Sequence, residues 1–459
     1  MADSFVSVVR DVGFKYFKPK RVGRESKLST ETLELMKRRR ELSLVASSDR
    51  ALNKQVKRLI RRDLRLFNTK LIEEAIEKNK GSKVFSQSFG RSHLTKLKTE
   101  DGRTVTSRPE LLAEVERFYG DLYASHATRP IACRDDDQRA VLTRHYTEDI
   151  PDVNLGEIDI ALGQLKINKA PGDDGVTAEL LRVGGKPVLK ELARLFNYVI
   201  HHGTTPEAWT RSVVVLFFKK GNISLLKNYR PISLLSHVYK LFSRVVTNRL
   251  AQRMDDFQPP EQAGFRKGFS TVDHIHTLRQ IIQKTEEYNL PLCLAFVDYE
   301  KAFDSIETWA VLESLQRCLI DYRYVEVLRC LYSSATMTVQ LQGQHTKPIQ
   351  LRRGVRQGDV ISPKLFTNAL EDVFKMLDWN YCGININGEF ISHLIVIMAS
   401  SLKDLSGMLN GLNVASQRVG LGMNLDKTKV MFNDHVKPRP ICIGNDTLEV
   451  VQNCMEKPK

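Results

Sequence analysis

Asp298 is the residue whose setting in the sequence most suggests chemistry. It follows residues 292–297, LCLAFV, whose length and composition predict a buried strand. An ionised carboxylate at the end of such a strand is costly unless a positive group meets it. A metal ion would serve, but hard divalent cations are rarely held by one carboxylate alone. A metal site at Asp298 therefore requires further acidic ligands from elsewhere in the chain.

Basic residues follow a second predicted strand. Residues 212–218, SVVVLFF, are β-branched and aromatic, and Lys219, Lys220 and Gly221 come directly after them. Lysines in a turn at the end of a strand can reach the phosphates of a ligand. A solvated hairpin would have the same composition, so this stretch does not by itself decide between the two.

A loop with two glycines adds a third candidate. In residues 352–366, RRGVRQGDVISPKLF, Gly354 and Gly358 flank three residues that end in Gln357. Glycine allows a ligand to approach the backbone closely, and glutamine can hydrogen-bond a base or a sugar. This pattern is typical of a loop that contacts a nucleotide.

The elements that position these residues are mixed helices and strands. From about residue 151 the pattern alternates between the two, and residues 187–203 predict a helix that ends at Gly203. Upstream, Ser107 and Glu110 predict a capping box at the start of another helix. The fold class predicted is therefore α/β.

The composition favours an anionic partner. The 459 residues include 69 Lys and Arg against 54 Asp and Glu, for a formal net charge of +15, which is typical of proteins that bind nucleic acid or anionic membranes. No run approaches the ~18 apolar residues of a membrane span, and the N-terminus lacks the apolar core of a signal peptide. The seven cysteines are scattered, as suits reduced thiols. We therefore expect a nuclear or cytoplasmic protein that is not secreted and has neither a membrane nor a small-molecule metabolite as partner.

The charge is concentrated near the N-terminus. Residues 36–66 contain eleven Lys and Arg against three acids, with Leu and Val at helical intervals. Such a basic helical arm can contact phosphates, which positions a nucleic acid without reading its sequence, or it can be a solvated helix face. The candidate nucleic-acid contacts are Lys37, Arg38, Arg39, Arg40, Lys57, Arg58, Arg61 and Arg62.

Six stretches together carry a family resemblance. KAPGDDG, FFKKGN…NYRPISLL, QAGFRKGFSTVDHI, FVDYEKAFDSI, RRGVRQGDVISPKLF and GLGMNLDKTKVMF occur in the order and spacing of a reverse transcriptase. Over residues 160–436 the chain resembles the LINE-type, RTE-like enzymes of non-LTR retrotransposons. The resemblance implies an α/β (α+β) right-hand polymerase fold with fingers and palm. It also implies RNA-directed DNA synthesis with Mg²⁺ as cofactor and an RNA template and DNA primer as partners.

The resemblance also implies a domain order. The chain is expected to consist of a basic helical arm or linker (1–80), a helical linker (81–150), the fingers (151–290), the palm (291–436) and a truncated tail that lacks the thumb (437–459).

The family's metal and sugar contacts carry over to three residues. Asp298 resembles the first metal-binding aspartate, and the backbone carbonyl of Tyr299 is similar in place to a second ligand. Phe303 resembles the aromatic residue that packs under the sugar and excludes a 2′-hydroxyl, which argues against an RNA-dependent RNA polymerase. Phe303 could also be a plain core residue.

The remaining contacts concern phosphates and the template. Lys219, Lys220 and Arg230 resemble the cations of the fingers that hold the incoming triphosphate, since lysine offers a point charge and arginine a planar fork. Arg230 could equally cap a turn. Gln357 and Gly358 resemble the palm contacts to nucleotide and template. Lys427 is similar in place to the lysine near the leaving pyrophosphate.

The family's paired aspartates are missing from this sequence. They belong in a strand–turn–strand hairpin, and residues 387–405, NGEFISHLIVIMASSLKDL, match its two strands. The turn itself, about five residues in the family pattern, is absent between Leu394 and Ile395. Asp298 is then expected to be a buried acid without metal partners, with little or no Mg²⁺ binding. The residues 391–398, ISHLIVIM, should form one uninterrupted strand or a sharp turn without Gly, Asn or Asp.

Two functions stay open from the sequence. One is a reverse transcriptase domain protein that is catalytically inactive in this form. The other is a non-catalytic nucleic-acid-binding protein derived from a retrotransposon. The missing turn is either a true deletion in a decayed copy or an error of the gene model, in which the stretch was wrongly spliced out, and the sequence fits both.

Overall fold

The structure is a computed structural model that describes residues 2–16, 28–43, 52, 54–63, 66, 94–125, 144–341, 343–379, 382–386, 389–392 and 396–451. These residues divide into two units, one of Met1–Gly13 with Lys96–Lys459 and one of Phe14–Thr95. Within the described residues no helix is long and apolar enough to cross a membrane.

The mixture of helices and strands is as predicted. The described helices are α1 (Ala2–Tyr16), α2 (Thr30–Ser43), α5 (Arg108–Tyr123), α6 (Leu155–Gln164), α7 (Ala178–Val183), α8 (Gly185–His202), α9 (Glu207–Thr210), η1 (Leu226–Asn228), α10 (His237–Phe257), α11 (Thr271–Glu287), α12 (Ala302–Ser305), α13 (Thr308–Arg317), α14 (Tyr322–Ser333), α15 (Ser362–Lys375) and α16 (Leu402–Arg418). Gly203 ends α8 with a φ of 64°, a left-handed conformation that glycine adopts without strain.

The strands are short and form separate sheets. They are β1 (Leu97–Lys98), β2 (Thr104–Val105), β3 (Arg211–Phe218), β4 (Tyr229–Leu234), β5 (Cys293–Phe296), β6 (Thr336–Leu341), β7 (Gln344–His345), β8 (Ile349–Gln350), β9 (Ile384–Ile386), β10 (Glu389–Ile391), β11 (Ile397–Ala399), β12 (Lys429–Phe432), β13 (Cys442–Ile443), β14 (Asp446–Thr447) and β15 (Glu449–Val450). The two predicted strands, 212–218 and 292–297, correspond to β3 and β5 and are confirmed.

Two of these sheets carry the candidate residues. In the β3 sheet, β3 pairs antiparallel with β4 and parallel with β6. In the β5 sheet the strand order is β11-β5-β12-β15, so β5 is central and β11 lies at an edge. Two sheets therefore supply the lysines that follow β3 and the aspartate that follows β5.

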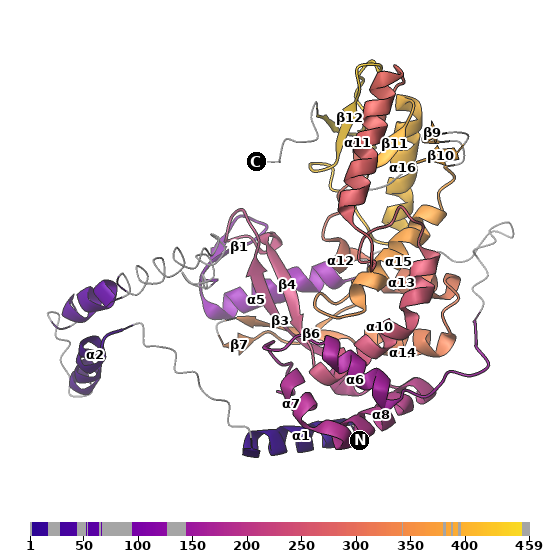
Figure 1. Cartoon of the computed structure of the whole chain (residues 1–459). Helices are drawn as coiled ribbons and strands as arrows, with labels where there is room; N and C mark the ends of the chain where they lie inside the picture. The colour runs from indigo at the N-terminus through magenta and orange to yellow at the C-terminus, as the bar shows by residue number, and fades with distance from the viewer. Residues whose placement is uncertain are drawn as a thin grey trace. The chain divides into compact units, whose positions relative to one another are not determined.

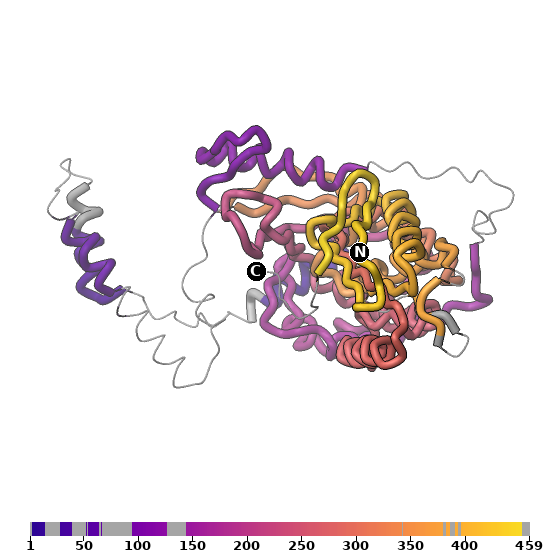
Figure 2. The backbone as a smooth tube through the Cα atoms, turned by 90° about the horizontal axis from the view of Figure 1, so that it is seen from above, coloured from indigo at the N-terminus to yellow at the C-terminus, as the bar shows by residue number. Residues whose placement is uncertain are grey.

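The β5 sheet is covered by helices on both faces. Ala295 belongs to the main core together with Leu412 of α16, whereas Leu294 packs with Leu278 of α11. This alternation follows from the two-residue period of a strand. Figure 1 shows α11 and α16 on opposite sides of the strands, and Figure 2 shows the same arrangement from above. Both faces of β5 are apolar, which explains why its sequence is continuously apolar.

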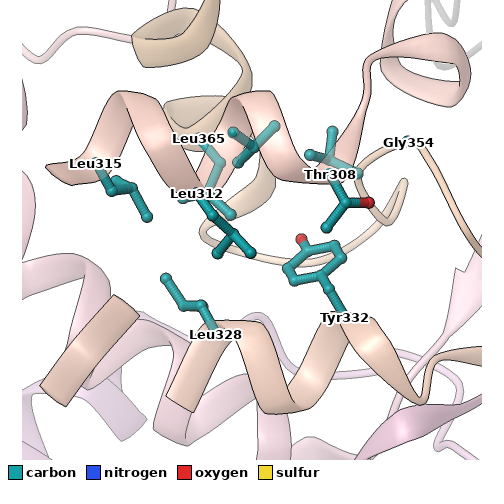
Figure 3. Close-up of a pocket in the computed structure, with 9 residues that line it drawn as sticks. Thr308, Leu312, Leu315, Leu328, Tyr332, Gly354 and Leu365 are labelled. Atoms are coloured by element: carbon teal, nitrogen blue, oxygen red, sulfur yellow. The ribbon is translucent and has the colours of Figure 1, made fainter. Parts of the chain in front are cut away.

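The helices beside this sheet pack tightly. Side chains of α13, α14 and α15, among them Leu312, Leu328 and Leu365, converge on an apolar space next to Tyr332 (Figure 3). No volume that a water molecule could enter remains there. This part of the core holds the helices in place and offers no site for a ligand.

One predicted alternative for residues 391–398 is wrong. The backbone N–H of Met398 donates a hydrogen bond of 2.8 Å to the carbonyl of Ser392. In an uninterrupted strand these residues would lie about 20 Å apart, since each residue advances ~3.3 Å. Ser392 and Met398 are therefore too close together for one continuous strand. The junction of Leu394 and Ile395 lies outside the described residues.

The predicted capping box is also only partly formed. Ser107 precedes α5 as expected, but its hydroxyl donates to the carboxylate of Glu110 at 2.6 Å and accepts no bond from a backbone N–H. The short hydroxyl–carboxylate bond competes with the backbone for the same oxygen. Pro109 in the first turn lowers the number of N–H groups that need a cap.

Candidate functional site

Asp298 lies where β5 ends against the loop before β12. Its backbone carbonyl accepts a hydrogen bond of 2.8 Å from the N–H of Asn424. Its own N–H donates to the hydroxyl of Thr428 at 3.3 Å. These bonds hold the strand end beside the segment that carries Lys427.

The partner of Asp298 is a lysine. The ammonium Nζ of Lys427 lies 2.7 Å from Oδ2 of Asp298, and the side chains of the lysine and the aspartate are 52% and 47% exposed. The expectation of a buried acid is therefore wrong, because the β5 sheet ends before Asp298 and leaves its carboxylate half in solvent. An ion pair so exposed contributes at most about 1 kcal/mol to stability.

The predicted cations lie around this pair. Lys219 follows β3, its N–H donates to the carbonyl of Asn228 at 2.9 Å, and β3 places Phe217 opposite Arg230. Partial burial lowers the pKa of Lys219, and the charges of Arg230, Lys427 and Lys220 lower it further, while Asp298 acts the other way. The structure therefore brings Lys219, Lys220, Arg230, Lys427 and Asp298 into one electrostatic cluster.

Tyr299 is fixed by its side chain and its backbone. Its hydroxyl lies 2.7 Å from Oγ of Ser416, and burial raises the pKa of this tyrosine to about 12. The backbone pairs with Met423 through hydrogen bonds made by the residues on either side. In such a pair the carbonyl of Tyr299 itself points away from the partner strand. That orientation leaves the carbonyl able to accept a further bond.

Phe303 contacts two other aromatic rings, one by stacking and one edge to face. Its ring stacks on Phe366 with centroids 4.6 Å apart, and it meets the edge of Phe265 at 6.1 Å. Phe303 is half-buried, whereas Phe265 is 59% exposed. The ring is thus held rigidly by the core and still reaches the surface.

Gln357 is engaged within the protein. Its Nε2 lies 2.8 Å from both carboxylate oxygens of Asp304, which also accepts a bond of 2.7 Å from the hydroxyl of Tyr123. Asp304 is buried, and desolvation raises its pKa. Asp304 was not predicted from the sequence, where its only signal is its place in the AFD triplet after Asp298. The amide of Gln357 orients this buried acid and is not directed at a ligand.

Gly358 is required by a close backbone approach. Its φ is 112°, and a Cβ at this position would lie 2.8 Å from the carbonyl oxygen of Ser233 in β4. The N–H of Ser233 in turn donates to the carbonyl of Gln357 at 2.8 Å. The predicted close approach is therefore real, but the neighbour is β4.

The described residues do not form a metal site of the family's kind. Among them, no three His, Cys, Asp or Glu side chains come together where a metal ion could bind. Asp298 offers one carboxylate, already paired with Lys427. Two Mg²⁺ ions in octahedral geometry need several oxygen ligands, so the described residues do not fit them. The position of the missing turn lies outside the described part of the chain.

The basic arm forms its own unit. In it α2 lies near a second helix, residues 54–63, and Asp63 accepts hydrogen bonds from the N–H and hydroxyl of Ser29 and the hydroxyl of Thr32. These bonds lower the pKa of Asp63. Arg62 pairs with Glu31 at 2.8 Å. The two helices are thereby tied at one end.

Most of the predicted arm contacts face solvent. Arg62 is half exposed but paired with acids. The side chains of Arg39 and Arg40 lie outside the described part. The remaining predicted contacts, Lys37, Arg38, Lys57, Arg58 and Arg61, are exposed.

Comparison with known proteins gives a consistent result. The profile of the family described as "Reverse transcriptase (RNA-dependent DNA polymerase)" matches residues 218–450. The Xenopus laevis "Transposon TX1 uncharacterized 149 kDa protein" is 30% identical over 68% of this chain and 23% of its own length. The "RNA-directed DNA polymerase from mobile element jockey" of Drosophila melanogaster is 28% identical over 48% of this chain and 24% of its own.

Further similarities are weaker. The "Retrovirus-related Pol polyprotein from type-1 retrotransposable element R2" of Nasonia vitripennis is 26% identical over 55% of this chain and 25% of its own length. Each match thus spans about a quarter of these curated relatives. Among solved structures, apo telomerase from Candida tropicalis, truncated from its C-terminal domain, matches with a TM-score of 0.38 and 13% identity over 59% of this chain and 67% of that one.

Proposed function

Because the chain belongs to the reverse transcriptase (RNA-dependent DNA polymerase) family and has non-LTR retrotransposon proteins among its relatives, we propose that it binds nucleic acid and a triphosphate but does not polymerise in this form. The fold agrees with that of a polymerase, and we propose that β3 belongs to the fingers and β5 to the palm. RNA template and DNA primer are the proposed partners, and the nucleus or the cytoplasm is the proposed location.

One observation carries the proposal. At the end of β5, where the family binds its metal ions, the carboxylate of Asp298 pairs with Lys427, and among the described residues it belongs to no group of three His, Cys, Asp or Glu side chains that could hold a metal ion. In the family the metals activate the attacking hydroxyl and hold the leaving phosphate. The side chains around Asp298 supply positive charge in place of acidic ligands. They can hold phosphates electrostatically, and they cannot hold two divalent cations.

The triphosphate site is proposed to consist of cations alone. Lys220, Arg230, Lys427 and Asp298 all lie close enough to Lys219 for their charges to act on its pKa. Phosphate oxygens would replace Asp298 as the partner of Lys427. The ring of Phe303, stacked on Phe366, offers the sugar a rigid apolar surface.

We expect Asp298→Asn to tighten metal-free triphosphate binding. The substitution removes a negative charge beside Lys427, and a unit charge a few ångströms away in water is worth about 1 kcal/mol, or roughly fivefold in affinity. Lys219→Ala should weaken binding by about tenfold, since it removes a hydrogen bond between charged groups. Anisotropy of a fluorescent deoxynucleoside triphosphate in EDTA measures both.

The exposed Lys190 of α8 provides a matched control, because Lys190→Ala should leave this affinity unchanged. If Asp298→Asn instead weakens binding when Mg²⁺ is added, Asp298 holds a metal ion and the proposal fails.

The alternative function, a nucleic-acid-binding protein without a catalytic role, is favoured by the exposed lysines and arginines of the arm. We expect the arm to bind RNA or DNA through phosphates, so the logarithm of the binding constant should fall linearly with the logarithm of salt concentration. Lys57→Ala with Arg58→Ala should make that slope shallower by about 0.7–0.9 for each phosphate that the arm no longer neutralises. Filter binding at several salt concentrations measures the slope.

The double variant Lys186→Ala with Lys190→Ala, both on α8 and exposed, removes the same charge from residues that are not part of the arm. A slope equally reduced in both double variants would assign the effect to net charge. A binding constant that does not respond to salt would exclude phosphate contact.

A further inference from the structure

A cavity lies between the palm sheet and the helices that cover one face of it. Its volume is about 190 Å³. Its wall is mostly apolar and includes side chains from β5 and the residue after it, from β11, and from α15 and α16: Ala295, Val297, Ile397, Leu370, Phe374 and Leu412. Figure 1 shows these elements side by side. An apolar cavity of ~150 Å³ in another protein accommodates a benzene molecule. The space is therefore large enough for one ring with a short substituent.

Two carboxyl groups interrupt this apolar wall. Glu371 of α15 and Glu261 of the loop between α10 and α11 both line the cavity. Glu371 is 3% exposed, and no hydrogen bond or ion pair to it is found among the described residues. A buried carboxyl without a partner in the protein is unusual, and this one is left to be met by whatever enters the cavity.

Among the residues that the structure describes, the charged groups near Glu371 leave its carboxyl without an ion pair. Burial raises the pKa of Glu371 to about 7, with Glu261 and Asp372 adding to the shift and Lys375 and Arg266 opposing it. Within the described part of the chain, neither cation makes an ion pair with Glu371. A cation that entered the cavity would meet this unpaired acid and a second acid nearby.

We propose that this cavity is a binding site for a small organic ammonium ion. The apolar body, one six-membered ring or its equivalent in size, lies against Val297, Leu412 and Phe374. The ammonium group lies between Glu371 and Glu261. A divalent metal ion is a poorer fit, because it needs about six oxygen ligands and the rest of the wall is apolar.

The site lies next to Asp298, because Val297 and Tyr299 on either side of that residue line the cavity, but none of the lysines and arginines of the cation cluster lines it. It lies behind β5 and against the first residues of β11, which pairs with β5 at the edge of the described sheet. A ligand there would add contacts to an edge strand. Its occupancy is therefore expected to stabilise the folded chain.

Benzylamine is the probe for this site, and benzyl alcohol is its neutral counterpart of nearly the same shape. Titration calorimetry and thermal melting of the full chain should show binding of benzylamine and a melting temperature that rises with its concentration. Benzyl alcohol should bind about tenfold more weakly or worse, since hydrogen bonds to charged groups contribute ~1.5–3 kcal/mol.

Glu371→Gln keeps the side-chain shape and should weaken benzylamine binding by about tenfold while changing that of benzyl alcohol little. Glu261→Gln, at a half-buried loop position, should weaken benzylamine binding by a smaller factor and tests the site independently if the first variant misfolds. Glu148→Gln, at an exposed position elsewhere, should change neither. Equal affinity for the amine and the alcohol, an unchanged affinity in both carboxyl variants, or no binding of benzylamine would each overturn the proposal.

Discussion

No extended primer above background is expected when the purified chain is given a primed RNA template, Mg²⁺ and all four deoxynucleoside triphosphates. Removal of a single preorganised electrostatic group typically lowers the rate of an enzyme ~10²–10³-fold. Here Asp298 belongs to no metal-binding group of three acidic, His or Cys side chains among the described residues and is paired with Lys427, so the loss should be larger. The matched control is Asp298→Asn, which should be as inactive as the parent chain. Extension that this substitution abolishes would mean that a metal site exists.

Insertion of an aromatic residue, Ala, Asp and Asp between Leu394 and Ile395 is expected to create metal affinity near Asp298. β11 is antiparallel to β5, with Ile397 opposite Ala295, so residues inserted before β11 would enter at the end of β5 that carries Asp298. Paramagnetic broadening by Mn²⁺ of signals near Asp298 measures the effect. The same insertion with Asn in place of both Asp should give none.

A failure of the Asp-containing insertion to bind Mn²⁺ would show that the hairpin has been placed at the wrong position in this sequence. Success would also bear on the origin of the chain, because it would show that the missing turn is the only defect of the metal site.

Arg356→Met is expected to cost about 3–5 kcal/mol of unfolding free energy, the usual effect of removing one partner from a buried charged network. Arg356 is 3% exposed and donates to the carbonyls of Trp209, Thr210 and Leu331 at 2.6, 3.3 and 3.0 Å. Its guanidinium also lies 5.6 Å from the ring centroid of Tyr239. Methionine would fill the space and leave all three carbonyls without this donor.

The destabilisation should extend to a buried acid. Asp359 is 5% exposed and accepts hydrogen bonds from the hydroxyls of Tyr239 and Ser243. Because Tyr239 contacts both charged groups, a substitution of Arg356 should also disturb the contacts of Asp359. Urea denaturation measures the effect, and Arg352→Met, at an exposed position of the same loop, should change stability by no more than ~0.5 kcal/mol. Equal destabilisation in the two variants would exclude the buried network as the cause.

Local sequence determined the elements and the family. The strands β3 and β5 were predictable because β-branched and apolar runs of that length have few other stable conformations, and the end of α8 was predictable because Gly203 readily adopts a positive φ. The order of the motifs was enough to indicate a reverse transcriptase, since it depends on residue types and spacing alone. The lysines after β3 and the acid after β5 were recognised for the same reason.

Only the tertiary structure decided what each candidate side chain contacts. Asp298 and Lys427 are 129 residues apart, and their pairing depends on how the loop before β12 returns beside β5. Tyr123 and Asp304, 181 residues apart, are joined at the same carboxylate that engages Gln357. No sequence pattern identifies such partners, because the packing of whole helices and strands determines which distant residues meet. The carboxyl of Glu371 is the clearest case: in sequence it is one acid on an amphipathic helix, and only the packing of that helix beside the β5 sheet buries it in the wall of a cavity.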